Sequence, residues 1–184
     1  MNNSNFKTVL LAAIFALIIS GCKQNDPPVP AEQELITTLK LNIGTQTFVF
    51  KVENGFGTSN PGTIQIDTIK LHADSNYLVI AELLNERKNP AEDITGEVIS
   101  EKDDHLFLYV SNPATGAGSI ATSNGSLDNN NAPFNQTVRF NTGQSGTGIL
   151  TVYLLHQPTN KSGTTPATSG GATDVEAVFP VVIE

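Results

Sequence analysis

The chain has 184 residues, a length that favours one domain, and its formal net charge is −8. No stretch is strongly basic, so we expect no surface that binds nucleic acid. A single cysteine excludes an intramolecular disulfide and any zinc or iron–sulfur site that needs several cysteines. Charged residues make up only 15% and 15 residues are glycine, which is typical of a β protein rich in loops.

The N-terminus begins with an apolar run at residues 8–19, and Lys7 is the one charge before it. The run has about 12 residues, whereas a membrane-spanning helix needs about 20, so it is the length of a signal-peptide core. It ends in Ile19-Ser20-Gly21-Cys22, which resembles the lipobox of bacterial lipoproteins. The resemblance implies that residues 1–21 are removed as a signal peptide and that Cys22 is lipidated.

Residues 22–33 contain three prolines and show no apolar periodicity, so we expect them to form a flexible tether between the lipid and residues 34–184. Two or more acyl chains, each contributing about 0.8 kcal/mol per buried CH₂, predict attachment to a membrane. An acidic residue soon after Cys-Lys resembles an export signal of Bacteroidota lipoproteins, and Asp26 fits it loosely. We therefore expect a lipid-anchored protein of the cell envelope, attached to the outer membrane. The sequence does not decide between its periplasmic and external faces.

From residue 34 onward the apolar residues alternate with polar ones, which is the period of half-buried strands. The pattern predicts an all-β, antiparallel two-sheet sandwich, immunoglobulin-like, with about eight strands. We place the strands at residues 35–43, 47–52, 64–71, 76–84, 105–111, 136–141, 148–156 and 175–183. The first two form a hairpin around Gly44-Thr45-Gln46. Two long polar loops, 112–135 and 157–174, carry too few apolar residues to order by themselves.

One segment, residues 89–101, has the period of a short helix. Asn89 is a suitable cap, Pro90 suits the first helical position, and Ile94 and Val98 are one turn apart and should face the sandwich. Gly96 costs the helix about 1 kcal/mol, so we expect only two or three turns.

Several segments resemble a family of short Bacteroidota lipoproteins, and together they cover most of the chain after the tether. They are ELITTLKLNI, LLNERKNPAEDITGEV followed by DDHLFLYV, GTGILTVYLLHQP and TDVEAVFPVVIE. Some members carry the name "type 1 periplasmic binding fold superfamily protein". That fold has two α/β lobes and nearly twice this length, which disagrees with the strand pattern here. The resemblance also implies genes near TonB-dependent receptors, and hence an accessory role in uptake across the outer membrane.

Motifs for catalysis are absent from the sequence: it has no Gly-x-Ser-x-Gly, no phosphate-binding loop and no His-Glu-x-x-His. We therefore expect a protein that is not an enzyme and requires no cofactor. The glycine-rich segment 143–148 is interpreted as a hairpin turn, and Asp128-Asn129-Asn130-Asn131 as a loop that only begins like a calcium site. Asp67-Thr68-Ile69 resembles an O-glycosylation acceptor of Bacteroidota, with Thr68 as the modified residue, but it also fits an ordinary strand position.

One group of residues stands out. Asp93, Glu97 and Glu101 are spaced at i, i+4 and i+8, and Asp103, Asp104 and His105 follow them. Three interpretations are open: a solvated acidic surface, a cation site, or a docking face for a basic partner. His156 also ends a predicted strand, so a sandwich that joins the two strand ends would offer imidazoles and carboxylates to Zn²⁺ or Cu²⁺.

Three classes of function follow from these observations. The first is a non-enzymatic accessory or binding lipoprotein, with a TonB-dependent receptor as its partner. The second is a lipoprotein that binds zinc or copper through the acidic and histidine residues. The third is a structural or adhesive surface module. The resemblance places the first ahead.

The lipobox generates the first prediction. The substitution Cys22→Ala removes the only sulfur that can be acylated, so the variant should accumulate as an uncleaved or soluble product without lipid. Metabolic labelling with a fatty-acid analogue checks this against the wild-type chain labelled in parallel. Equal labelling of the two chains would contradict the anchor.

Overall fold

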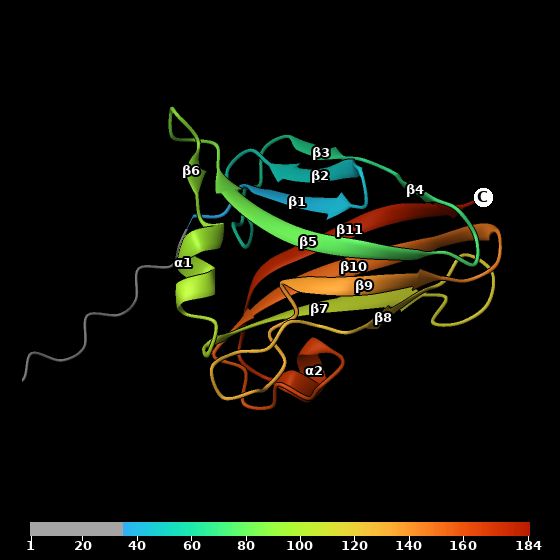
Figure 1. Ribbon diagram of the computed structural model, residues 1–184. Coiled ribbons are helices and arrows are strands. Elements are labelled where there is room, and N and C mark those ends of the chain that lie inside the picture. The colour runs from blue at the N-terminus through green and yellow to red at the C-terminus, as the bar shows by residue number, and fades with distance from the viewer. Residues whose placement is uncertain (1–34) are drawn as a thin grey trace, which may run out of the picture. The chain divides into compact units, whose positions relative to one another are not determined.

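A computed structural model describes residues 35–184, which form a two-sheet β-sandwich (Figure 1). Cys22, the predicted signal peptide and the predicted tether lie outside the described residues. The larger sheet has the strand order β3-β2-β1-β5-β9-β8, with β6 paired to β5, and the smaller has the order β4-β11-β10-β7. The all-β prediction is thus confirmed.

The strands of the larger sheet are β1 (Thr38–Ile43), β2 (Gln46–Val52), β3 (Ile64–Ile66), β5 (Asn76–Asn85), β6 (Glu92–Asp93), β8 (Ile120–Ser123) and β9 (Thr137–Thr142). Those of the smaller sheet are β4 (Ile69–Leu71), β7 (His105–Asn112), β10 (Gly146–His156) and β11 (Ala172–Ile183). Neighbouring strands are antiparallel, except that β4 runs parallel to β11.

The strand order is that of an immunoglobulin-like domain. Strands β1-β5-β9-β8 correspond to A-B-E-D of that fold, and β7-β10-β11 correspond to C-F-G. Strands β2 and β3 extend the first sheet beyond this pattern. The predicted hairpin is confirmed as the β1–β2 pair, in which Ile43 faces Gln46 across a two-residue turn that begins with Gly44 at φ 59°.

Alternation along the strands fills the space between the sheets. Leu39, Leu41 and Ile43 of β1 are fully buried, as are Leu150, Val152 and Leu154 of β10. The Phe179 ring of β11 meets the Phe50 ring of β2 edge-on, with centroids 5.6 Å apart, so aromatic contacts join the two sheets.

The predicted strand 64–71 is wrong, because the chain changes sheets within it. The backbone N–H of Asp67 donates to Val49, and the Asp67 carboxylate accepts the Val49 N–H, which ends β3. After Thr68 the chain enters the other sheet as β4, where Ile69 and Leu71 are buried. This division, together with the short β6 and β8, gives the described chain eleven strands, not eight.

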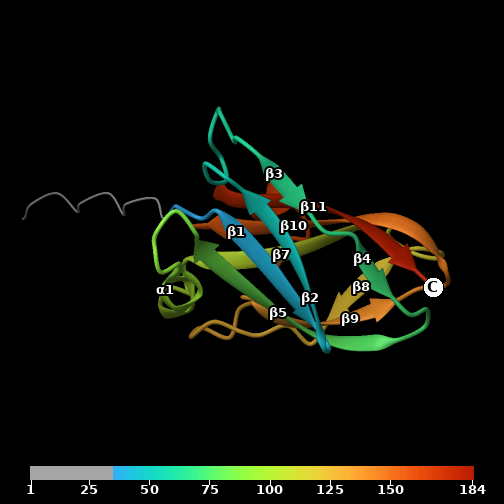
Figure 2. The same cartoon turned by 90° about the horizontal axis from the view of Figure 1, so that it is seen from above.

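The prediction that Asn89 caps a helix is also wrong. The helix α1 is Thr95–Ser100, because residues 92 and 93 pair with β5 as β6. An Asp93 carboxylate oxygen accepts the Thr95 N–H at 2.9 Å, where the helix begins. Ile94 and Val98 are buried in the core, as predicted. Both views place α1 at the end of the sandwich where β5 ends and β7 begins (Figures 1 and 2).

Segment 143–148 is not a hairpin turn, since residues 143–145 carry the chain from β9 in one sheet to β10 in the other and residues 146–148 begin β10. Its glycines are explained by close backbone approach. A Cβ on Gly143 or Gly148 would collide with the backbone of Gly116 or Gly118 in the preceding loop.

The two long polar loops are ordered in the structure. Loop 112–135 contains β8, and loop 157–174 contains a short helix, α2 (Pro166–Ser169). The described chain therefore has two short helices, whereas the sequence predicts only one. The Thr165 and Thr168 side chains cap α2 reciprocally.

The packing predicts that truncating two different leucines to alanine has very different effects on the free energy of unfolding. Leu150 is 0% exposed and Leu78 is 47% exposed. Leu150→Ala should lower the free energy of unfolding by about 2–5 kcal/mol, because it leaves a cavity in the core. Leu78→Ala is the matched control and should change it by about 0.5 kcal/mol or less. Urea unfolding measures both, and similar losses would contradict this core.

Candidate metal site

Two histidines lie side by side at the end of the smaller sheet. In the β7–β10 ladder His105 faces His156 directly, and their rings stack with centroids 4.9 Å apart and planes 8° from parallel. The sequence could only propose that these two strand ends adjoin. The register shows that they do.

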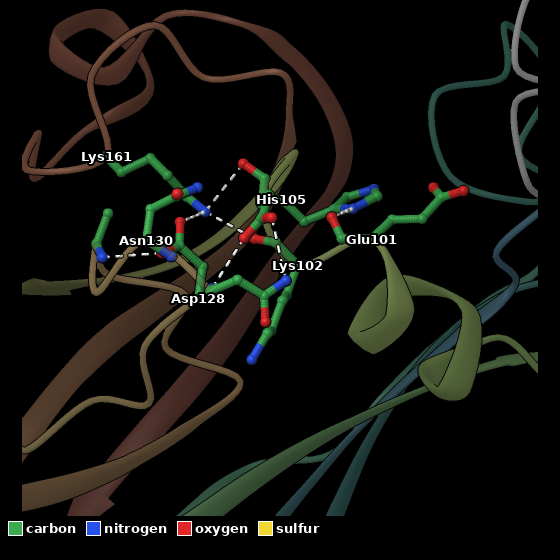
Figure 3. Close-up of polar contacts among 9 residues, drawn as sticks. Glu101, Lys102, His105, Asp128, Asn130 and Lys161 are labelled. Atoms are coloured by element: carbon green, nitrogen blue, oxygen red, sulfur yellow. Dashed lines mark hydrogen bonds and ion pairs between the residues drawn. The ribbon is translucent and has the colours of Figure 1, made fainter.

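The orientation of His105 is fixed by a backbone contact. His105 is only 3% exposed, and its Nδ1 lies 3.0 Å from the carbonyl oxygen of Glu101 (Figure 3). Because a carbonyl can only accept, Nδ1 carries the proton and the neutral ring has its lone pair on Nε2. This is how proteins usually orient a metal-binding histidine.

Asp174 is the third member of the group. Leu154 of β10 faces Val175, but Leu155 faces Thr173, so Asp174 is the extra residue of a β-bulge in β11. Bulges change the direction of a side chain. Here the ligand atoms of His105, His156 and Asp174 all lie within 4.8 Å of one another.

Sequence reasoning missed Asp174, which it placed in a loop. The alternating pattern that locates a strand does not show where one residue is inserted into the ladder. The one available signal was its position directly before the strand 175–183, but the sequence does not show that the start of this strand adjoins the histidines.

The arrangement is suited to a small divalent ion. Tetrahedral zinc with bonds of about 2.1 Å separates neighbouring ligand atoms by about 3.4 Å, so no pair of ligand atoms needs to close by more than about 1.4 Å. Two imidazoles and one carboxylate leave a fourth position for water or another ligand.

The predicted acidic residues do not form one face beside the histidines. Asp93 precedes the helix and contacts Thr95, while Glu97 and Asp104 are exposed. Glu101 reaches His105 through its backbone carbonyl and not its carboxylate. The expected i, i+4, i+8 row is wrong, because α1 spans only Thr95–Ser100.

Asp103 belongs to a different contact. Its carboxylate accepts hydrogen bonds from the backbone and side-chain N–H groups of Asn129. In the described part of the chain, the group of side chains that could hold a metal ion is therefore His105, His156 and Asp174.

A buried ion pair holds the backbone that leads into His105. Lys161 Nζ donates to Asp128 Oδ2 and to the Lys102 carbonyl, both at 2.7 Å, and to the Asp103 carbonyl at 3.2 Å (Figure 3). The side chains of Lys161 and Asp128 are only 11% and 2% exposed. This contact joins both long loops to the turn before β7.

Asp128 is fully engaged by protein groups. Its other carboxylate oxygen accepts the N–H groups of Asn130 and Ala132, each at 2.8 Å. Burial raises the pKa of Asp128, but the hydrogen bonds from Lys161 and from these N–H groups outweigh it and hold the pKa below its usual value. The segment 128–131 is thus a loop, as interpreted from the sequence.

Thr68 lies in the exposed link between β3 and β4 and not within a strand. The ordinary strand reading of Asp67-Thr68-Ile69 is therefore wrong. Its glycosylation stays a prediction.

No family model, curated protein or solved structure matches the chain. Among residues 35–184, no helix is long and apolar enough to cross a membrane.

The ion pair predicts a pH-dependent loss of stability. Asp128→Asn should lower the free energy of unfolding at pH 7 by about 2–3 kcal/mol, because Lys161 loses its charged partner. The folded pKa of Asp128 is lowered, so its contribution is complete above the unfolded pKa of about 4 and is lost as the pH falls through the folded value.

Urea unfolding of wild type and variant between pH 7 and pH 2 should therefore show curves that converge in acid. Asp104→Asn, at an exposed position close to the pair, is the control and should leave the curve unchanged. A constant difference between wild type and Asp128→Asn at every pH would contradict the ion pair.

Proposed function

We propose that this protein is a lipid-anchored envelope protein that binds zinc or copper ions through His105, His156 and Asp174. The observation that carries the proposal is the direct cross-strand pairing of the two histidines, with a carboxylate within 4.8 Å of both. Imidazole suits both metals, and two imidazoles with one carboxylate form a known type of zinc ligand set.

The surroundings support a ligand role for His105. The hydrogen bond to the Glu101 carbonyl engages the protonated Nδ1 and leaves Nε2 for a metal. The turn that supplies this carbonyl is followed by Lys102 and Asp103, whose carbonyls are held by Lys161. A site supported in this way loses little conformational freedom when it binds an ion.

Such a site would bind the ion and not catalyse a reaction, as we expect from a sequence without the catalytic motifs named above. Lipidation at Cys22 would keep the site at the membrane, where it would act as a carrier or sensor of the ion. An accessory role beside a TonB-dependent receptor is supported only by the sequence resemblance, and a structural or adhesive role is the third class that the sequence leaves open. Both stay predictions.

The third histidine provides a control for the site. His72 is exposed in the segment between β4 and β5, away from the pair in the fold. Isothermal titration of the full-length chain in detergent with Zn²⁺ should show one site. Affinity should fall about 100-fold in His105→Ala or His156→Ala, and about tenfold in Asp174→Asn, with no change in His72→Ala.

A second measurement separates loss of a ligand from loss of the fold. In NMR spectra of the histidine side chains, added Zn²⁺ should shift Nε2 of His105 and leave its Nδ1 proton in place. Zinc binding that is equal in wild type and in the His105→Ala/His156→Ala double variant would overturn the proposal, as would zinc coordination at Nδ1.

A further inference from the structure

A second feature is an apolar cavity of about 410 Å³, which shares only Asp174 with the proposed metal site. It lies between β2, the loop 53–63 and the first half of β11, a stretch of β11 that β4 does not cover. Its apolar lining comes from both sheets and from the loop: Phe50, Val52, Phe56, Pro61, Ile64 and Val178. The Phe50 and Phe56 rings are 5.7 Å apart, so aromatic surface forms part of the wall.

The charged groups of this cavity all have one sign. Asp174 and Glu176 line it from β11, and no lysine, arginine or histidine is among its described lining residues. The Glu176 side chain is exposed, and Tyr153 O–H lies 3.5 Å from its carboxylate. Burial and this nearby negative charge raise the pKa of Tyr153, which agrees with a local negative potential.

Most small-molecule sites combine an apolar wall with a few polar groups that fix orientation. A carboxylate pair beside aromatic rings selects a positive charge, since the carboxylates attract it directly and the ring faces attract it through their quadrupoles. An anion would be repelled, and a neutral molecule would gain only the apolar contact.

We propose that this cavity binds a small organic cation, a protonated amine that carries an aromatic or alkyl body. The ammonium group lies against Asp174 and Glu176, and the body packs on Phe56 and the neighbouring apolar side chains. Asp174 belongs to both this cavity and the metal-binding group, whereas Glu176 belongs only to the cavity. Glu176 therefore separates the two sites experimentally.

The test uses three probes of similar shape and different charge. Isothermal titration of the full-length chain at pH 7, without metal, compares 2-phenylethylamine, 2-phenylethanol and 3-phenylpropionate. The amine should bind about tenfold more tightly than the alcohol, and the carboxylate should bind most weakly.

Variants assign that preference to the cavity. Glu176→Gln should reduce the preference for the amine over the alcohol several-fold, while Glu97→Gln, an exposed glutamate on α1, should leave it unchanged. Phe56→Leu keeps an apolar side chain but removes a ring face, so it should weaken the amine more than the alcohol.

The outcomes distinguish this proposal from the metal site. Glu176→Gln should not change Zn²⁺ affinity, and His105→Ala should not change amine affinity. Equal binding of amine and alcohol, an unchanged preference in Glu176→Gln, or no amine binding at millimolar concentration would each overturn the organic-cation site, whatever the result of the zinc titration.

Discussion

The register of β10 with its two neighbours is the constraint on which the functional part of this structure depends. On one side it places His156 opposite His105, and on the other a bulge brings Asp174 to the same point. A slip of one residue would turn the histidines to opposite faces of the sheet. The buried pair Phe107 and Leu154, two positions from the histidines, makes such a slip costly because both side chains belong to the core.

Loop 112–135 buries Ile120 and Phe134 in the core, and polar contacts connect it to loop 157–174 at this end of the sandwich. The ammonium group of Lys161 has three protons and three acceptors, one from Asp128 and two from the backbone before β7. The loops lack the apolar residues to fold separately, but one buried ion pair with satisfied hydrogen bonds connects them. The same turn supplies the carbonyl of Glu101 that orients His105.

The two proposed sites meet at Asp174, which follows from its position on the bulge. The histidine pair is on one side, and the cavity walled by Phe50 and Phe56 is on the other. An ion at the histidines would compete with an amine for the same carboxylate, so each ligand would weaken the other by an equal factor. The carboxylate that both proposed sites share is thus Asp174, which lies outside the acidic segment 93–104.

The alternation of apolar residues was sufficient to determine the all-β class, the first hairpin and the buried faces of β1, β10 and β11, because period two is a local property of a strand. Local signals placed the start of the helix wrongly at Asn89, because residues 92 and 93 pair with β5 and the helix begins only after them. They also failed at Asp67 and at segment 143–148, where the chain passes between sheets. Only the tertiary structure brought His105, His156 and Asp174 together, because register and bulges arise from contacts between residues far apart in the chain.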